Sequence, residues 1–584
     1  MRVFRDLWWF FVQEKKSYII GIIFLIVASS FSLVPPYVVG VIVDHIEQKS
    51  LTVNTLLVWV GLILASGVIH YGSNFIWRSM LFGSAIKLGR QLRNQLYEHF
   101  TNMSPGFFQK RRTGDLMAHA TNDVQAVEGT AGEGVLTLVD SVVMGSLVVI
   151  VMFFFSWELT LITLMPMPLM AWATSRYGTL LHERFHKAQA AFSELNDKVQ
   201  ENVAGMRVVK AFGIEEAEKA KFRKQSADVV DKNMAVARID ALFDPTISFI
   251  VGISYFLAIF FGAVFVVRNT MTLGELTSFT IYLGLLIWPM LALGFLFNIV
   301  ERGRASYDRI SRLLKIKPDI VNREGAVDER PQGEIAFHIQ TFAYPGQETP
   351  ALQNVHFSLQ PGETVGLVGK TGSGKTTVLK LLLREFDCEN GDIAIGGRSI
   401  YDYTLDALRR SIGYVPQDHF LFSATIAENI AFANPDASQG EIERVARLAH
   451  IHEDILGFQD GYDTIVGERG VTLSGGQKQR ISIARALLAD PDILILDDSL
   501  SAVDAKTEEA ILRSLKQTRQ NKTTIIAAHR LSAVQHANLI LVLDQGRIVE
   551  RGTHDHLMNH EGWYASVYRS QQLEALVAKG GMTS

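Results

Sequence analysis

One stretch of nine residues has the spacing of a phosphate-binding loop. It fits the pattern G-x-x-x-x-G-K-[ST] without a mismatch and consists of Gly369, Lys370, Thr371, Gly372, Ser373, Gly374, Lys375, Thr376 and Thr377. Glycines let backbone N–H groups surround a phosphate without Cβ clashes, and the start of a helix adds a positive dipole end. We therefore expect Lys375 to reach the β- and γ-phosphates of a nucleotide, and the Thr376 hydroxyl to ligate Mg²⁺.

The residues on either side of this loop favour the elements that the motif requires. An apolar run, 364–368, leads into the loop and is typical of a buried strand, and the run 378–383 that follows is typical of a helix. A strand, a glycine-rich turn and a helix form the structural context of a phosphate loop. A chance glycine-rich turn, the alternative, has no reason to carry both flanking patterns.

Five residues elsewhere have types and positions that suit the same chemistry. Asp497 ends an apolar run, and a carboxylate at the end of a buried strand suits a Mg²⁺ ligand. Asp498 follows and is placed to orient an attacking water. We expect Gln417 near Mg²⁺ or that water, His529 near the γ-phosphate, and Tyr344 against the adenine ring. Taken singly, each of the five also fits an ordinary core or loop position.

The composition indicates a large chain that lies partly in lipid. At 584 residues it is too long for one ordinary domain, and 48% of its residues are hydrophobic. The mean hydropathy of +0.16 is high for a soluble enzyme. A net charge of −4 gives no sign of a nucleic-acid partner. The single cysteine, Cys388, excludes an intrachain disulfide framework.

We expect the first half of the chain to cross a bilayer six times. Residues 18–43 carry no charge and are long enough for a hydrocarbon core of about 30 Å, with a kink at Pro35–Pro36. The other expected spans are 51–77, 141–156, 159–175, 242–267 and 276–300. Asp140 lies at or just before the third span, so it is a candidate for a substrate cavity or for the headgroup boundary.

The distribution of lysine and arginine predicts the orientation of these spans in the cell membrane. The first, third and fifth connections carry only Lys49 and Arg268, whereas the second and fourth connections are rich in basic residues. By the positive-inside rule, the N-terminus, both basic connections and the second half of the chain are cytoplasmic. Residues 1–13, with Trp8 and Trp9, favour a helix at the membrane interface, or else an ordinary soluble helix.

The two basic connections favour helices that continue from the spans into the cytoplasm. They are charged and poor in proline, and we expect their turns near 105–108 and 212–214. Turns with exposed aromatic residues suit docking on a soluble domain, although a solvated hairpin fits the same pattern. The sequence thus divides into a transmembrane domain, 1–315, a linker, 316–333, a nucleotide-binding α/β domain, 334–575, and a tail, 576–584.

The segment 473–480 reads Leu-Ser-Gly-Gly-Gln-Lys-Gln-Arg and resembles the signature of ATP-binding-cassette (ABC) transporters. With six spans ahead of the cassette, almost the whole chain resembles a half-transporter of the exporter type. Glu468 and the segment 501–504 also match cassette motifs in their expected order, and 107–116 and 205–212 resemble the two coupling regions of the family. The resemblance implies ATP, Mg²⁺, a lipid bilayer and an ATPase coupled to transport.

The family resemblance further implies a dimer with two shared ATP sites. In each site the phosphate loop of one chain faces the signature of the other, here Ser474, Gly475, Gly476 and Gln477, with Asp504 in the adjoining D-loop. A signature at a helix N-terminus is a second anion site, too far from its own phosphate loop to serve it. Binding of ATP to the closed state would then drive the membrane half between inward- and outward-facing states.

Asp498 is the one departure from the family pattern that bears on mechanism. Members that hydrolyse ATP well usually have Glu at this position, and a carboxylate withdrawn by about 1 Å can cost on the order of 100-fold in rate. An intact signature beside a weak base is what one half of a heterodimer looks like, as in the bacterial heterodimeric multidrug exporters. In the homodimer alternative, Asp498, or His529 with water, serves both sites.

The expected function is ATP-driven export of amphipathic small molecules, including drugs, from the cytoplasm or the inner leaflet. A lipid flippase and a peptide exporter are alternatives with the same transport chemistry. An ATP-gated regulator or channel is a further alternative, because Asp498 would suit a protein in which binding matters more than turnover. Apolar spans are expected both for contact with lipid and for a hydrophobic substrate cavity, so the sequence does not identify the transported substrate.

Overall fold

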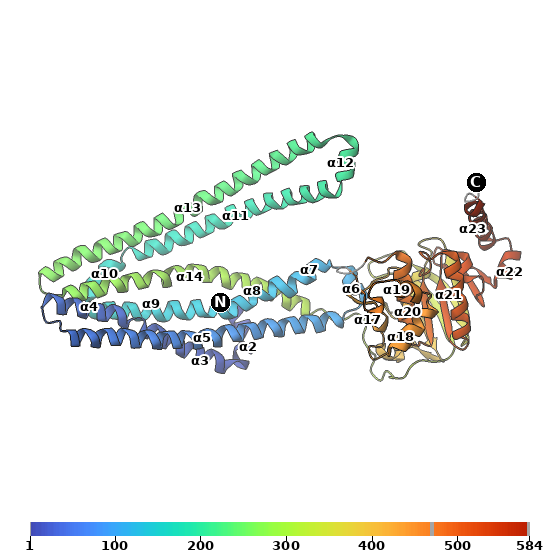
Figure 1. The fold of residues 1–584 in the computed structure, drawn as a ribbon, viewed down its shortest axis with the longest axis horizontal. Coiled ribbons are helices and arrows are strands. Elements are labelled where there is room, and N and C mark those ends of the chain that lie inside the picture. Colours follow the sequence, from blue (N-terminus) through green and yellow to red (C-terminus); the bar gives the residue numbers. More distant parts are fainter. Residues whose placement is uncertain (1, 468–471, 581–584) are drawn as a thin grey trace. The chain divides into compact units, whose positions relative to one another are not determined.

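The computed structural model describes residues 2–467 and 472–580 and divides into two compact units. The first unit contains Met1–Asn102 and Arg111–Lys317, and the second contains Met103–Lys110 and Pro318–Ser584. Figure 1 shows the first unit as a set of long helices and the second as a mixed α/β body. The domain limits expected from the sequence stay predictions.

Helices are the regular secondary structure of the described residues in the first unit. Its helices are α1 (Arg2–Asp6), α2 (Trp8–Gln13), α3 (Lys15–Phe31), α4 (Val34–Glu47), α5 (Val53–Thr101), α7 (Thr113–Ala118), α8 (Val124–Gly129), α9 (Val135–Phe155), α10 (Trp157–Leu164), α11 (Met167–Ala204), α12 (Met206–Phe212), α13 (Glu215–Val267) and α14 (Leu273–Leu314). Two π-helical turns, His119–Asp123 and Thr130–Gly134, join α7, α8 and α9 into one long rod.

The break between α3 and α4 lies where the sequence predicts a kink. Helix α3 ends at Phe31, and Pro35 and Pro36 fall in the first turn of α4. Proline is tolerated there because the first N–H groups of a helix have no intrahelical acceptor. The expected kink is therefore confirmed as a local restart of the helix.

Five helical stretches of the described chain are long and apolar enough to cross a membrane. They are Lys15–Glu47, Val53–Thr101, Thr113–Phe155, Glu215–Val267 and Leu273–Leu314. The expected fourth span falls on α10 and α11, which are separated at Met165–Pro166, so it remains a prediction. Asp140 lies inside α9, half-buried, and its role in a cavity also remains a prediction.

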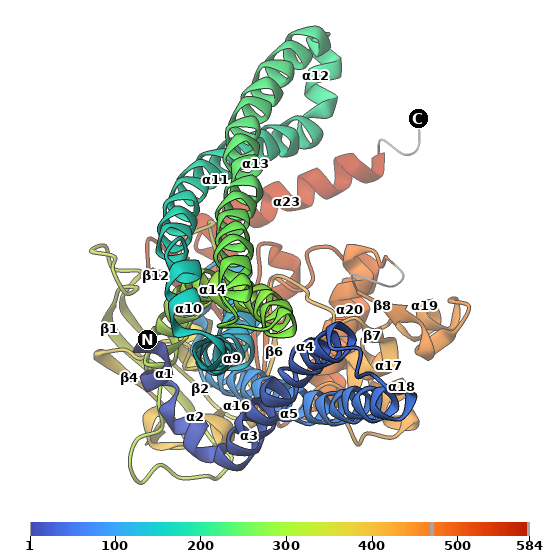
Figure 2. The ribbon, with the colours of Figure 1, turned by 90° about the vertical axis from the view of Figure 1, so that its left-hand side faces the viewer.

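Helices α11 and α13 form a hairpin that projects from the other helices of the first unit, with α12 at its tip (Figures 1 and 2). Helix α12 ends at Phe212, and Gly213 follows with φ +65°, a left-handed conformation that suits glycine. The turn expected near 212–214 is therefore present. Phe212 is 76% exposed, as expected for an aromatic residue at such a tip.

The second unit is built on two main sheets. The four-stranded antiparallel sheet has the order β2-β1-β4-β5, and the six-stranded sheet has the order β12-β11-β3-β10-β9-β6, in which only β12 is antiparallel. The strands are β1 (Ile335–Phe342), β2 (Leu352–Leu359), β3 (Thr364–Gly369), β4 (Asn390–Ile395), β5 (Arg398–Ser399), β6 (Ile412–Val415), β7 (Ala424–Thr425), β8 (Ile465–Val466), β9 (Ile493–Asp497), β10 (Thr523–Ala527), β11 (Leu539–Asp544) and β12 (Arg547–Gly552).

The second unit also contains helices. They are α6 (Pro105–Gln109), α15 (Lys375–Leu382), α16 (Leu405–Arg410), α17 (Ile426–Ala431), α18 (Gln439–Leu448), α19 (His452–Leu456), α20 (Gly475–Leu488), α21 (Ala505–Thr518), α22 (His554–Asn559) and α23 (Trp563–Gly580). Strands β9 and β10 are buried over their whole length, which explains their unbroken apolar sequences. Because β3, β9 and β10 are parallel neighbours, their carboxyl ends meet at one edge.

Residues expected to form a linker belong to the second unit from Pro318 onward. The Val327 N–H donates to the Asp402 carbonyl at 2.8 Å, and the Val327 carbonyl accepts from the Thr404 N–H at 3.0 Å. The buried Arg384 donates to the Val321 carbonyl at 2.9 Å. This segment is therefore fixed on the α/β body by backbone and side-chain hydrogen bonds.

Candidate nucleotide-binding site

The phosphate loop joins β3 to α15 in a conformation that requires glycine. Gly369 has φ +146°, and a Cβ built there would lie 2.1 Å from the Leu543 carbonyl oxygen. Gly374 has φ +105°, and its Cβ would lie 2.8 Å from a methyl group of Leu352. The backbone of the loop thus packs tightly against β2 and β11, with no room for a side chain at either glycine.

Lys375 lies across the loop and is 7% exposed. Its ammonium donates to the carbonyls of Gly369 at 2.8 Å and Lys370 at 3.0 Å. Burial lowers the pKa of Lys375, and attraction to Asp498 and Asp497 opposes this shift. The arrangement holds a poorly solvated cation where an entering phosphate would meet it.

The strand-end carboxylate of Asp497 meets the loop. The Thr376 hydroxyl donates to its Oδ1 at 3.2 Å, and the Tyr414 hydroxyl donates to its Oδ2 at 3.4 Å. Asp497 is 3% exposed, and this burial raises the pKa of its carboxyl. A hydroxyl and a carboxylate are oxygen ligands of the kind that Mg²⁺ takes together with nucleotide phosphates.

Asp498 follows β9 with φ +47°, a left-handed conformation that aspartate tolerates better than most residues. Its N–H donates to the Ala527 carbonyl at 2.8 Å. Its Oδ1 accepts from the N–H of His529 at 3.5 Å, so the two residues expected to act on an attacking water or the γ-phosphate are neighbours. The His529 side chain is exposed.

A cavity of about 510 Å³ lies over the loop and brings together most residues expected from the sequence. Those that line it are Tyr344, Thr371, Gly372, Ser373, Gly374, Lys375, Thr376, Thr377, Gln417, Asp497, Asp498 and His529. Gly369 and Lys370 do not line it, and their carbonyls accept from the Lys375 ammonium. The signature residues and Asp504 are also not part of the lining.

Tyr344 lies at one side of this cavity, where its hydroxyl is 2.9 Å from the Thr377 hydroxyl. Its ring packs edge-on against Phe386, with ring centroids 5.2 Å apart. Tyr344 also lines a second cavity, of about 1120 Å³, together with Gly106 and Gln109 of α6. One aromatic ring therefore borders both the loop cavity and the short helix at the expected first coupling turn.

Six lining residues were not expected from the sequence: Gln347, Thr349, Pro350 and Ala351, which lie between β1 and β2, and two that follow β11. Gln545 and Gly546 form the turn between β11 and β12 with φ +48° and +77°. The Gly546 N–H donates to the Ser373 carbonyl at 3.0 Å, so this turn supports the phosphate loop. The sequence signals a tight hairpin at this point, but it contains nothing that links the hairpin to residues far earlier in the chain.

The signature segment begins helix α20. Ser474 is its N-cap and accepts from the Gln477 N–H at 3.2 Å, while the Gln477 side chain accepts from the Ser474 N–H at 3.0 Å. Gly476 packs so close to the D-loop that a Cβ would lie 2.9 Å from the Ala502 carbonyl oxygen. Asp504 is the N-cap of α21 and accepts from the Thr507 N–H at 3.0 Å. Glu468 lies outside the described residues.

Comparison with known proteins agrees with this fold. Residues 18–290 match the model of the ABC transporter transmembrane region, and residues 352–501 match the model of the ABC transporter. The chain is 50% identical to the multidrug resistance-like ATP-binding protein MdlA of Escherichia coli (strain K12), with 98% of each chain covered. It is 47% identical to the probable multidrug resistance ABC transporter ATP-binding/permease protein YheI of Bacillus subtilis (strain 168), with 98% of each covered.

A more distant relative and a solved structure extend the comparison. The ATP-dependent lipid A-core flippase of Syntrophus aciditrophicus (strain SB) is 34% identical over 90% of this chain and 87% of its own. The structure of a bacterial Atm1-family ABC exporter with ATP bound superposes with a TM-score of 0.78 at 26% identity, covering 95% of this chain and 99% of that one.

The chain belongs to the ABC transporter family. It is a multi-pass membrane protein of the exporter type whose nucleotide-binding domain is cytoplasmic, and an ATPase coupled to transport. Two of its relatives are described as multidrug resistance proteins.

Proposed function

We propose that this chain is one half of a heterodimeric exporter that moves amphipathic small molecules. The observation that carries the proposal is the pairing of Asp498, in place of the usual Glu, with an intact Ser474 signature on α20. The partner is a second ABC half-transporter that has Glu after its own strand-end aspartate. ATP bound between the two cassettes would hold them together, and hydrolysis would release them.

In this proposal the phosphate loop holds ATP, with Lys375 at the β- and γ-phosphates and Tyr344 against the adenine. Lys375 would exchange its two carbonyl acceptors for phosphate oxygens, which favours the bound state because an ammonium–phosphate pair is the stronger interaction. Thr376, Asp497 and Gln417 supply the oxygen ligands for Mg²⁺, which neutralises phosphate charge. The contact between the Thr376 hydroxyl and the Asp497 carboxylate supports this assignment.

Asp498 is a weak base for this chemistry for two reasons. Its side chain is one methylene shorter than that of Glu, and a retreat of about 1 Å can cost on the order of 100-fold in rate. Its Oδ1 also accepts from the N–H of His529, which turns that oxygen toward the backbone. The site built on this phosphate loop would therefore bind ATP and hydrolyse it slowly.

The signature of this chain would act on the ATP of the partner. The first amides of α20 and the Ser474 hydroxyl form an anion site at a helix N-terminus. Because the signature does not line the cavity over its own phosphate loop, it is available to a second nucleotide. This is the physical basis for expecting two shared sites.

The chemistry of the cargo is proposed from the relatives rather than from the site. Two of them carry multidrug resistance in their descriptions, which supports amphipathic drugs as substrates. The lipid A-core flippase among the relatives supports a lipid as the second candidate. Transport of a dye and of a labelled lipid into or across proteoliposomes, compared in one preparation, distinguishes the two.

ATPase activity of the purified chain, alone and with a candidate partner, tests the proposed assembly. We expect little turnover from the chain alone, because both of its sites would carry Asp498, and a rise of at least about tenfold when the partner is added. Robust turnover of the chain alone that is lost in Asp498→Asn would show a homodimer and contradict the proposal.

A further inference from the structure

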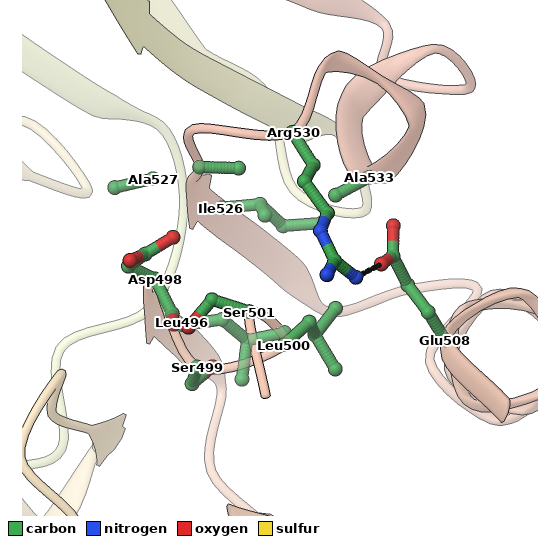
Figure 3. A pocket seen from close by; sticks show the side chains of 11 residues that line it. Leu496, Asp498, Ser499, Leu500, Ser501, Glu508, Ile526, Ala527, Arg530 and Ala533 are labelled. Carbon is green, nitrogen blue, oxygen red and sulfur yellow. Dashed lines mark hydrogen bonds and ion pairs between the residues drawn. The ribbon is translucent and has the colours of Figure 1, made fainter. Parts of the chain in front are cut away.

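The loop that carries His529 is held by several anchors. We call residues His529–Leu531 the switch loop. On one side, the N–H of His529 donates to Asp498 Oδ1 at 3.5 Å. On another, the Arg530 guanidinium donates to the Val503 carbonyl at 2.9 Å and to the buried Glu508 carboxylate at 3.2 Å. Figure 3 shows Arg530 reaching across to Glu508, with Asp498 on the other side of the same small pocket.

The third anchor comes from the C-terminal helix. Gln571 of α23 donates through Nε2 to the His529 carbonyl at 2.9 Å, and its Oε1 accepts from the Leu531 N–H at 3.0 Å. One side-chain amide therefore binds the backbone on both sides of Arg530. The backbone of a neighbouring parallel strand would make the same two hydrogen bonds, to the carbonyl of His529 and the N–H of Leu531. Together they hold the backbone at His529 and thereby the direction of its Cα–Cβ bond.

Helix α23 is itself anchored, so that it can hold the loop. The Glu550 carboxylate accepts from the Trp563 N–H at 2.6 Å at the start of the helix. The Tyr564 hydroxyl lies 2.8 Å from Nδ1 of His554, and the Tyr568 hydroxyl donates to the Gln535 side chain at 3.0 Å. Tyr564, Tyr568 and Gln571 have the spacing i, i+4, i+7 and share one helix face.

We propose that Gln571 is a positioning residue that aims the His529 imidazole at the γ-phosphate. This inference rests on the proposed function, in which we assign His529 the role expected from the sequence, a contact with the γ-phosphate. The imidazole is exposed, so packing does not fix its place, and the backbone of the switch loop must do so. A displacement of about 1 Å can abolish a well-aligned contact, so a mobile switch loop would weaken the contact of the His529 imidazole with the γ-phosphate. ADP has no γ-phosphate, so its binding would be unaffected. The C-terminal helix thus contributes to recognition of the third phosphate from outside the nucleotide cavity.

The affinities of the full-length chain for ATP and for ADP, measured in lipid nanodiscs with a fluorescent nucleotide competitor, test this role. Gln571→Leu keeps the volume and removes both hydrogen bonds, and we expect ATP affinity to fall about fivefold while ADP affinity is unchanged. Gln571→Glu keeps the acceptor for Leu531 but loses the donor to His529, and should show the same selective loss. Gln572→Leu, at the exposed neighbouring glutamine, is the control and should change neither affinity.

His529→Ala, measured in parallel, separates this inference from the proposed function. If His529→Ala lowers ATP affinity selectively and both Gln571 variants match wild type, the inference is overturned and the role of His529 stands. If both Gln571 variants lower ATP and ADP affinity equally, Gln571 only supports the fold, and the inference is again overturned. If His529→Ala leaves both affinities unchanged, the proposed role of His529 fails and the inference fails with it.

Discussion

At the scale of the residue, the site contains two buried charged groups, Lys375 and Asp497. Burial raises the pKa of Asp497 and lowers the pKa of Lys375, so each group is shifted toward its neutral form. Burial also raises the pKa of Tyr414, whose hydroxyl donates to Asp497. Burying these charged groups costs folding free energy. Such a cost is expected at a site whose charges are compensated by a nucleotide polyphosphate and its metal ion.

Asp497→Asn is expected to stabilise the protein while it destroys nucleotide binding. A pKa raised in the folded state means that ionised Asp497 opposes folding at pH values above that pKa. Asparagine removes the buried charge and keeps hydrogen-bonding atoms for Thr376 and Tyr414. The unfolding temperature without nucleotide should rise at pH 7 by about 2–4 °C, measured by scanning fluorimetry.

The pH dependence of this gain provides the control. Below the unfolded pKa of an aspartate, about 4, the carboxyl is neutral in both states and the cost of burying it vanishes. The difference between Asp497→Asn and wild type should therefore shrink as the pH falls from 7 toward 4. A lower unfolding temperature for Asp497→Asn at pH 7, without nucleotide, would show that the carboxylate stabilises the fold instead.

At the scale of the element, the site is assembled from helix starts and strand ends. The phosphate loop opens α15, Asp497 ends β9, and the signature opens α20. Helix starts expose unpaired N–H groups, which attract anions. The ends of parallel strands place side chains such as that of Asp497 at the same edge of the sheet. The D-loop residue Asp504 is a helix N-cap as well.

Replacement of Ser474 separates its capping role from its proposed contact with the ATP of a partner. Ser474→Ala removes the N-cap of α20 and should cost about 1 kcal/mol of stability, whereas Ser474→Gly should cost only a few tenths. Both lack the hydroxyl, so we expect both to lower the ATPase turnover of the assembled pair by about tenfold or more. ATP binding to the chain itself should not change, because the signature does not line its cavity.

Stability and turnover are read separately in that experiment. If turnover of the pair falls only in Ser474→Ala and follows its loss of stability, the hydroxyl acts on the helix and makes no contact with the nucleotide of the partner. A change in ATP affinity of the lone chain would place the signature at its own phosphate loop, against the proposed sharing of sites.

The elements that the sequence predicts well are those governed by local rules. Gly369 and Gly374 mark the phosphate loop because only glycine fits their backbone, and Pro35–Pro36 marks the break before α4 because proline cannot continue a helix. Asp497 could be placed because parallel strands end at one edge. Local rules were weaker at Met165–Pro166, where the expected fourth span divides into two helices.

The contacts that the sequence does not predict join segments far apart in the chain. Nothing in a hairpin at Gln545–Gly546 indicates that it supports Ser373, and Gln571 looks like any polar residue of a C-terminal helix. Their partners are set by how β11 and α23 pack on the sheet. Contacts between distant segments leave no local pattern in the sequence. The residues that support the site from behind, Gly546 and Gln571, are therefore found only in the structure.

At the scale of the whole molecule, the chain passes between its two units at three points. These are the bonds 102–103, 110–111 and 317–318, because α6 belongs to the second unit while the chain on either side of it belongs to the first. These three connections are the covalent links between the α/β unit and the helical unit. Helix α6 borders the cavity that also contains Tyr344, which links the nucleotide site to the first of these crossings.

The central claim is that the working ATP site of the transporter combines the phosphate loop and Glu of a partner with the signature of this chain. The most direct test is the ATPase turnover of the assembled pair after the acid of each site is changed. We predict that turnover survives Asp498→Asn in this chain, because its own site contributes little, and is lost when the corresponding Glu of the partner is changed to Gln. Turnover that is abolished by Asp498→Asn and retained after the change in the partner would contradict the account.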